Sequence, residues 1–446
     1  MIRIGDDFSE ILKKGGTALF LRILGFLAGY LFVYYTVRFF GAETQGRISL
    51  SFSVLMIASL ISILGADVNF VKIFAIENNF NNAKGLFIKA YPFFIGGAAL
   101  LGTVLFVFSS WISTYIFKDP ELAPFLQWTA PCIVLYTLML INASVFRGLR
   151  MNTLYAFLFN GGRFIFTLLF FGLFVWLWKR DAVITAAAHT IAIGTLFVIS
   201  VWYLKKHLHP FTKQTHYKVS SFLKDSFPMF LSASMIVMLG WTDTVVLGIY
   251  EESNVVGMYS VALKIATVVS FSLQAVDSIL APKLSNAYYS DNIILFKSLI
   301  KFSTLINAVI SIVSVLGIFL FKDFILNLFG PEFIEATIAL IILCIGQLFN
   351  SIIGPVGSIF QMTGHQKVFQ NILVISFIIN LTLNLVLVKP YGINGVAFAT
   401  ACSLIFSKIA SAIYVKKLTE NLMNKIARKI FLTLSTLSVF NFFLIR

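Results

Sequence analysis

Three charged side chains lie well inside apolar stretches of this chain, where charge is uncommon. Arg163 and Lys264 are cations, and Asp243 is an acid. A charge inside a bilayer is costly unless it meets a partner or a water-filled cavity, so each of the three marks a candidate functional site. Guanidinium and ammonium groups bind phosphate oxygens well. The three residues therefore predict a cavity whose cations hold an anionic substrate while Asp243 takes part in coupling or gating.

A structural alternative exists for two of these residues. Asp243 and Lys264 are predicted on consecutive antiparallel spans, so they could instead form a buried ion pair that sets helix packing. Arg22 is a further candidate cation, and near the end of its span it either reaches the cavity or extends to the membrane surface. Asn160 lies three positions before Arg163 on the same helical face, where it would give the cavity polar support.

A pair of acids occupies equivalent places in the two halves of the chain. Asp67 and Asp277 are 210 residues apart, and both are predicted near the cytoplasmic ends of spans. They would gate the inner mouth of a cavity or carry a proton, or else cap neighbouring helix N-termini. The 3 cysteines and 5 histidines show no spacing typical of a metal site or a disulfide framework, so neither a metal nor a cofactor is predicted.

The elements that must position these residues are membrane-spanning helices. Apolar residues make up 59% of the 446 residues and charged residues 12%, which is far from the composition of a soluble domain. A stretch of roughly 20 apolar residues is long enough to cross a bilayer. Twelve such spans are predicted, at 17–40, 48–71, 91–117, 123–146, 153–177, 182–204, 227–250, 256–282, 302–321, 336–360, 368–388 and 395–414. A possible thirteenth lies at 430–445.

The spans fall into two sets of six whose landmarks recur at a nearly constant distance. Gly46 and Gly257 are 211 residues apart, as are Pro120 and Pro331. A constant offset indicates duplication, and an even number of helices per copy relates the copies by an axis along the membrane normal, with a cavity at their interface. We therefore expect an N-terminal lobe at 1–204, a cytoplasmic linker at 205–226, a C-terminal lobe at 227–414 and a basic segment at 415–446.

Lysine and arginine are distributed unevenly between the two predicted sides. With the N-terminus in the cytoplasm, the inner segments hold 22 of the 34 basic residues and the outer segments hold 7, Arg47 among them. An excess of basic residues on the inner side sets membrane orientation, so the N-terminus is predicted to be cytoplasmic. The net charge of +15 then lies in short loops that face an anionic leaflet, which argues against nucleic-acid binding.

No segment outside the spans is large enough to fold into a catalytic domain. The sequence also lacks the phosphate-binding loop, the zinc-protease motif and the nucleophile elbow. The chain is therefore predicted to be a transporter and not an enzyme. A membrane polymerase of polysaccharide assembly is a weaker alternative, because such an enzyme needs a sizeable loop to hold its catalytic groups.

Five segments resemble, in order and spacing, the polysaccharide flippases of the multidrug/oligosaccharidyl-lipid/polysaccharide exporter superfamily. The first of them, FFGAETQG, follows the first span and is similar to the LLGxxxxG signature of that family. The segments are 39–46, 329–333, 364–367, 380–385 and 389–395, the last followed by Ala397 and Ala399. The resemblance covers roughly residues 10–415.

The resemblance implies an all-α integral membrane protein of six plus six helices, V-shaped around a central cavity. It implies that this cavity flips an undecaprenyl-diphosphate-linked oligosaccharide by alternating access, from the cytoplasmic to the outer leaflet of the bacterial inner membrane. The product would enter O-antigen, capsule or exopolysaccharide synthesis. A polysaccharide polymerase and a chain-length regulator are the implied protein partners.

The main alternative is a cation-coupled multidrug exporter of the same superfamily. That branch typically places an essential acid in the first span, whereas the first span here contains Arg22 and no acid, which favours an anionic substrate. Relatives that handle cell-wall lipid intermediates have fourteen spans, and the last two form a groove for the lipid tail. This chain is predicted to have at most thirteen, so that groove does not carry over intact.

Overall fold

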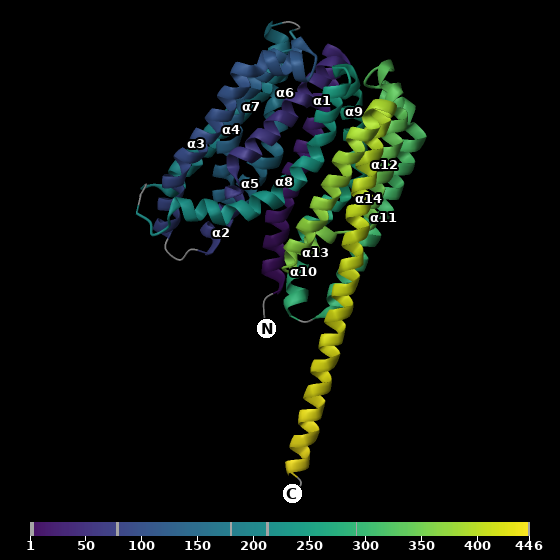
Figure 1. The fold of residues 1–446 in the computed structure, drawn as a ribbon. Coiled ribbons are helices and arrows are strands. Elements are labelled where there is room, and N and C mark those ends of the chain that lie inside the picture. The colour runs from purple at the N-terminus through teal and green to yellow at the C-terminus, as the bar shows by residue number, and fades with distance from the viewer. Residues whose placement is uncertain (1–3, 77–79, 179–180, 211–213, 291, 445–446) are drawn as a thin grey trace. The chain divides into compact units, whose positions relative to one another are not determined.

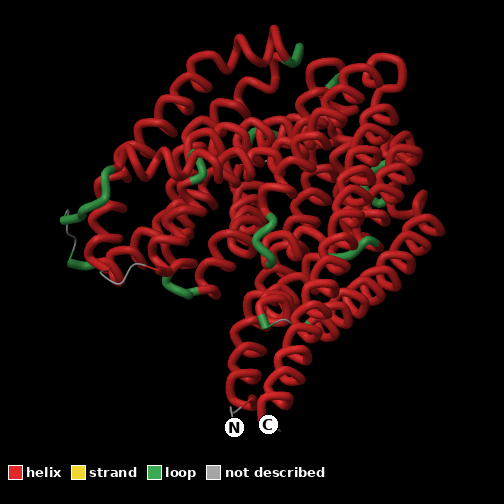
Figure 2. The backbone as a smooth tube through the Cα atoms, turned by 60° about the horizontal axis from the view of Figure 1, so that its bottom comes forward, coloured by secondary structure: helices red, strands yellow, loops and turns green. Residues whose placement is uncertain are grey.

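The computed structural model describes residues 4–76, 80–178, 181–210, 214–290 and 292–444, and all the regular elements in these ranges are helical (Figure 1). Figure 2 shows the helices joined by short turns and loops. The predicted all-α class is confirmed. The α-helices are α1 (Ile4–Ile63), α2 (Ala66–Ile76), α3 (Phe80–Trp111), α4 (Ala123–Gly148), α5 (Asn152–Ala156), α6 (Gly162–Trp178), α7 (Ile184–Leu208), α8 (Val219–Tyr250), α9 (Ser253–Thr267), α10 (Phe271–Tyr289), α11 (Ile293–Asn327), α12 (Thr337–Ile352), α13 (Val356–Met362) and α14 (Gln366–Leu444). Short 3₁₀ or π-helical segments are η1 (Ile112–Ile116), η2 (Pro120–Leu122), η3 (Phe157–Gly161), η4 (Val268–Ser270) and η5 (Pro331–Ala336).

Within the described residues, nine helices are long and apolar enough to cross a membrane. A tenth candidate is a pair of shorter helices, Asn152–Phe159 and Gly162–Leu177, which are bent by 44° with respect to each other. Two of the nine, Phe20–Ile63 with 44 residues and Gln366–Glu420 with 55 residues, are much longer than one span requires.

A glycine divides each of these two long helices. Gly41 (φ 80°, ψ 178°) and Gly392 (φ 49°, ψ −131°) have a backbone conformation outside the helical region. Both glycines fall between spans that the sequence predicts as separate, so each long helix contains two of them. With each of these two helices counted as two spans and the bent pair counted as one, the described helices are consistent with the twelve predicted spans.

The second span ends earlier than predicted. α1 stops at Ile63 instead of residue 71, because Leu64 (φ 50°) and Gly65 (φ 75°) both adopt left-handed conformations that turn the chain. Gly65 also has no room for a side chain, since a Cβ there would overlap the backbone of α8 near Phe230. α2 is therefore a separate short helix, and Asp67 lies in its first turn.

The chain forms two compact units. The first comprises residues 1–265, 321–340 and 380–399, and the second comprises residues 266–320, 341–379 and 400–446. In the first unit, α1 packs against α4, α6 and α8, while α4 packs against α3 and α7. In the second unit, α10 packs against α13 around a core that includes Leu284, Phe296 and Phe360.

A symmetric contact inside the first unit joins equivalent positions of the two predicted copies. Gly46 of α1 lies against the carbonyl oxygen of Ser253 in α9, and Gly257 of α9 lies against the carbonyl oxygen of Ala42 in α1. A Cβ on either glycine would overlap that oxygen. Ala42 and Ser253 are 211 residues apart, as the two glycines are. The contact therefore reads the same from either copy, as a two-fold relation requires.

Helical structure extends into two segments that the sequence predicts to join or follow the lobes. α7 continues to Leu208 and α8 begins at Val219, so residues 209–218 connect them; 211–213 lie outside the described residues. α14 is helical as far as Leu444, which includes nearly all of the possible span at 430–445. Side chains beyond residue 420 are likewise outside the described part of the chain.

Candidate functional site

Asp243 is the centre of a buried polar cluster that joins three helices of the first unit. The phenol of Tyr259 in α9 donates a hydrogen bond to Asp243 Oδ2 at 2.8 Å. The side-chain amides of Asn380 and Asn384, both in α14, donate to Asp243 Oδ1 at 3.1 and 2.7 Å. All four side chains are buried. The two asparagines, four residues apart on one face of α14, thus bond between helices.

One acceptor in this cluster has no hydrogen bond. The Asn384 amide nitrogen donates to Asn380 Oδ1 at 3.1 Å as well as to Asp243. For Asn384 Oδ1, which is also buried, the described residues provide no donor. A buried carbonyl oxygen without a donor is costly, and carboxylate and amide oxygens are the ligand types that small hard cations prefer.

Lys264 of α9 reaches across to α1. Its Nζ donates to the carbonyl oxygen of Gly29 at 2.7 Å, and the Tyr30 hydroxyl donates to the Lys264 carbonyl oxygen. Lys264 Nζ lies 5.2 Å from the centroid of the Tyr30 ring and 5.1 Å from that of Phe164. Aromatic faces stabilise a cation without neutralising its charge.

Arg163 lies beside the same aromatic ring. It is the second residue of α6, directly after the π-helical segment η3, and its Cζ is 5.1 Å from the Phe164 centroid. Two cations therefore share one ring. The structure brings Arg163 and Lys264 together, as the sequence-based hypothesis requires. Like charges at close range repel each other, so a bound anion would stabilise both groups.

The surroundings of Arg163 are aromatic and dry. Only 7% of the residue is exposed, and its Cζ lies 5.2 Å from the Phe52 centroid and 5.3 Å from the Tyr136 centroid. Its Nε is buried without a hydrogen-bond partner among the described residues. Among the residues that the structure describes, no carboxylate forms an ion pair with Arg163. A buried guanidinium that lacks a counter-ion is unfavourable, which makes this group a strong candidate for anion binding.

Two further predicted residues lie near these cations in the sequence. Arg22 is half-buried in α1, seven residues before Gly29, and this spacing places both on one helical face. Asn160 belongs to η3, immediately before α6. Its side chain lies outside the described residues, so its predicted role as polar support stays a prediction.

The two repeat-related acids occur in different compact units. Asp67 is in the first turn of α2, where its carboxylate accepts a hydrogen bond from the backbone amide of Val68. This contact lies within the first turn of Asp67's own helix, so the capping of a neighbouring helix, which the sequence left as one alternative, stays a prediction. Asp277 is half-buried in α10 of the second unit, where Lys408 interacts with it electrostatically.

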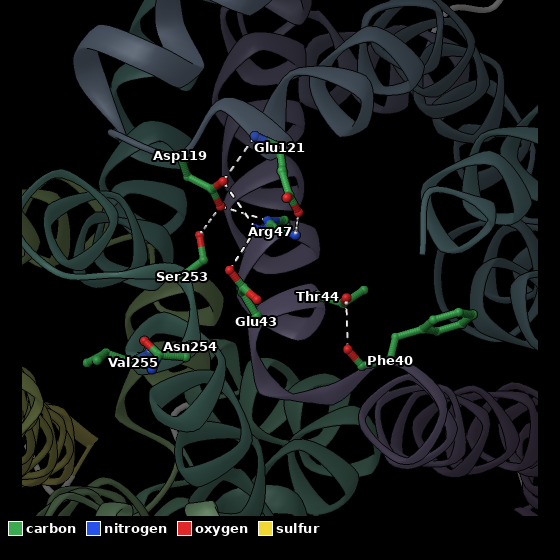
Figure 3. Close-up of polar contacts among 9 residues, drawn as sticks. All are labelled: Phe40, Glu43, Thr44, Arg47, Asp119, Glu121, Ser253, Asn254 and Val255. Atoms are coloured by element: carbon green, nitrogen blue, oxygen red, sulfur yellow. Dashed lines mark hydrogen bonds and ion pairs between the residues drawn. The ribbon is translucent and has the colours of Figure 1, made fainter. Parts of the chain in front are cut away.

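A second charged cluster surrounds Arg47, which the sequence places in an outer segment (Figure 3). Arg47 is 6% exposed and binds three carboxylates. Its Nε and Nη2 donate to Asp119 at 2.7 and 3.2 Å, its Nη2 donates to Glu43 at 2.7 Å, and its Nη1 lies 2.7 Å from Glu121. Ser253, the first residue of α9, donates to Asp119 at 2.6 Å. The cluster thus ties α1 to the η1–η2 connection and to α9.

Part of this second cluster could be read from the sequence. Glu43 and Arg47 are four residues apart, the spacing at which opposite charges on a helix pair. Asp119 is 72 residues from Arg47, and no sequence pattern connects the two. The sequence counts Arg47 among the basic residues between spans, whereas the structure places it in α1, where its three partners allow it to be buried.

A bundle of helices long and apolar enough to cross a membrane defines an integral membrane protein, and solved membrane transporters have a similar fold. The fold is similar to that of the lipid II flippase MurJ in an inward closed conformation, with a TM-score of 0.72 and 16% identity over 91% of this chain and 87% of that one. It is also similar to a multidrug resistance MATE family transporter of the MOP superfamily in an inward-facing conformation. That match has a TM-score of 0.71 and 14% identity, and covers 92% of this chain and 99% of the other.

The chain belongs to the polysaccharide biosynthesis protein family, whose model matches residues 11–287. The MatE model matches residues 228–386. The probable low-salt glycan biosynthesis flippase Agl15 of Haloferax volcanii is 30% identical over 176 residues, which is 39% of this chain and 37% of that protein. The capsular polysaccharide biosynthesis protein CapF of Staphylococcus aureus is 25% identical over 253 residues, which is 53% of this chain and 63% of that protein. These alignments cover less than two thirds of each relative.

Proposed function

We propose that this protein flips an undecaprenyl-diphosphate-linked oligosaccharide from the cytoplasmic to the outer leaflet of a bacterial inner membrane. The units would serve O-antigen, capsule or exopolysaccharide synthesis, where a polymerase with its chain-length regulator would use them. The observation that carries the proposal is the pair of cations on Phe164. Arg163 is buried, no ion pair involves it within the described ranges, and Lys264 lies on the same ring.

The chemistry of a diphosphate matches this pair. Its oxygens accept charge-assisted hydrogen bonds from a guanidinium fork and from an ammonium group, which are about twice as strong as neutral ones. A bound diphosphate would also give a partner to Arg163 Nε, which has none among the described residues. Arg22 would extend the cationic path along the same face of α1. The polyprenyl tail would stay in the bilayer while the head group crosses.

The Asp243 cluster would couple transport to a cation gradient. Its carboxylate and the Asn384 carbonyl oxygen are buried within one network that joins α8, α9 and α14. Binding of a proton or a sodium ion there would change how these three helices are held together, which is the change that alternating access requires. Asp67 and Asp277 would act as gating acids at the cytoplasmic ends of the two lobes, with the N-terminus in the cytoplasm.

The test is flipping of a fluorescent polyprenyl-diphosphate sugar by purified protein in vesicles, read as protection from a quencher outside. Arg163→Ala and Lys264→Ala should each lower the rate about 10- to 100-fold, the value of a hydrogen bond to a charged group. Arg38→Ala is the matched control, because it removes an exposed cation from α1. Wild-type rates in both cavity variants would overturn the assignment of the site.

A cation-coupled multidrug exporter is the second candidate, because the MatE model matches residues 228–386, which contain the Asp243 cluster. The two candidates differ in the sign of the substrate charge. An exporter of cationic drugs would expel a cationic dye from loaded vesicles, and Arg163→Ala would leave that efflux intact or improve it. Flipping of the diphosphate lipid without dye efflux would exclude this candidate.

A further inference from the structure

A cavity of 1010 Å³ lies within the first unit between α2, the start of α8 and the loop that precedes α8. The two helices pack against each other and lie side by side in Figure 1. Basic side chains line the cavity: Lys72 from α2, His216 and Lys218 from the loop, and Lys224 from α8. Asp225 is the single acid among the lining residues. With the histidine neutral, the lining carries a net positive charge.

The walls of this cavity are fixed by packing. The Asn69 amide of α2 donates to the Phe222 carbonyl oxygen at 3.3 Å and to Ser226 Oγ at 3.0 Å, both in α8. The preceding loop is anchored as well, because the Thr215 hydroxyl donates to the Asn82 carbonyl oxygen of α3 at 2.9 Å. These hydrogen bonds hold the surrounding backbone in place without a ligand, so the basic side chains are attached to a preformed frame.

The three lysines, Lys72, Lys218 and Lys224, are exposed and form no ion pair with any residue that the structure describes. Lys218 is also the N-cap of α8, and among the described residues no side chain caps this helix end. The free backbone amides of a helix N-terminus add to the attraction for an anion that the three ammonium groups create.

Apolar side chains also line this cavity, beside the polar residues Asn69 and Ser221, and they indicate the kind of anion. Ile73, Ile76, Pro228 and Met229 line the same cavity as the lysines. Ile76 is 67% exposed. Cations beside exposed apolar side chains are typical of a surface at the boundary between headgroups and acyl chains. In the proposed orientation this end of the unit meets the cytoplasmic leaflet.

We propose that this cavity, which we call the α2–α8 pocket, binds the phosphate of an anionic membrane lipid. Bound lipid would neutralise the three lysines and clamp α8, whose far end carries Asp243, to the membrane surface. The inference concerns binding and is independent of the flipping reaction. The phosphate could belong to a bulk phospholipid or to the polyprenyl diphosphate itself, and the experiment distinguishes these sources.

The test measures lipid retention on the detergent-solubilised full chain by native mass spectrometry, with dioctanoyl phosphatidylglycerol and dioctanoyl phosphatidylcholine as probes. We expect phosphatidylglycerol to bind more tightly, and the triple variant Lys72→Gln, Lys218→Gln, Lys224→Gln to lose about 100-fold in affinity, on the order of five-fold per lysine. The matched control removes three exposed lysines that do not line the pocket, Lys205→Gln, Lys301→Gln and Lys416→Gln. Circular dichroism and thermal unfolding confirm that both variants are folded.

In a second arm of the experiment, farnesyl diphosphate is the probe. Only the part of its binding that is lost in the triple lysine variant is attributed to the pocket. Tighter binding of farnesyl diphosphate than of phosphatidylglycerol assigns the pocket to the polyprenyl substrate, and weaker binding assigns it to bulk phospholipid. The proposal would be overturned if the pocket variant and the control variant lost equal affinity. It would also be overturned if the charged and the zwitterionic phospholipid bound equally and farnesyl diphosphate showed no pocket-dependent binding.

Discussion

Replacing Asp119 by alanine removes the principal partner of the buried Arg47 guanidinium. The carboxylate accepts two hydrogen bonds from Arg47, one from Ser253 Oγ and one from the backbone amide of Glu121. Only 7% of the Arg47 side chain and 14% of the Asp119 side chain are exposed, so solvent cannot replace these contacts. Loss of one partner from a buried ion pair costs about 3–5 kcal/mol, because the remaining charge stays buried.

The other two acids of the cluster provide internal controls. The side chains of Glu43 and Glu121 are 60% and 76% exposed, although each lies 2.7 Å from Arg47. Exposed ion pairs contribute about 0–1 kcal/mol, since water and salt screen them. We therefore expect Glu121→Ala and Glu43→Ala to lower the free energy of unfolding by less than about 1 kcal/mol each.

The double variant Arg47→Met, Asp119→Ala, together with the two single variants, forms a double-mutant cycle. Methionine fills part of the space of the guanidinium without its charge, so the double variant should be less destabilised than the sum of the single variants, with a coupling energy of about 2–3 kcal/mol. The measurement is reversible unfolding in mixed detergent micelles, followed by circular dichroism. If Asp119→Ala unfolds within about 0.5 kcal/mol of Glu121→Ala, or if the cycle shows no coupling, the energetic assignment is wrong.

Three other variants test separate features. Gly257→Ala should separate α1 from α9 and stop flipping, because a Cβ there overlaps the Ala42 carbonyl oxygen, whereas Gly97→Ala, with open space around it, should have no effect on the same vesicle assay. Asp243→Asn should abolish the dependence of flipping on a pH or sodium gradient, and an unchanged gradient dependence would refute the coupling role. Glu251, at the end of α8 outside the spans, has a pKa raised by burial and by the Glu252 charge, so its protonated form is favoured in the folded state. The stability that this protonated carboxyl contributes is present below the ordinary carboxyl pKa and is lost as the pH rises through the raised pKa. Glu251→Gln should therefore flatten the dependence of unfolding free energy on pH between these two pKa values. A dependence as steep as that of the wild type would contradict this.

The spans could be predicted from the sequence because the bilayer requires every backbone polar group to be satisfied within the helix. The apolar stretches alone identify the helices, and the breaks at Gly41 and Gly392 fall where the hydropathy pattern separates spans. The end of the second span was not predictable, because it depends on Gly65 lying against the backbone of α8. A contact between segments so far apart leaves no trace in a local hydropathy pattern.

The candidate site, like the spans, could be predicted from the sequence only in part. Arg163, Lys264 and Asp243 stand out in the sequence because a charge within an apolar stretch needs a reason. The sequence could not show that Phe164 is shared by both cations, or that Asn380 and Asn384 donate to Asp243. These contacts depend on which faces of α6, α8, α9 and α14 meet.

The sequence by itself determined the membrane class and the approximate spans, and it predicted a duplication and the residue types of a candidate site, because hydropathy, offset and charge are properties of the chain. Only the tertiary structure decided which charges are compensated. Arg47, counted as a loop charge, is buried with three carboxylates, whereas no ion pair involves Arg163 among the described residues. The physical reason is that charge compensation depends on distances of a few ångströms between segments far apart in the chain, and helix packing sets those distances.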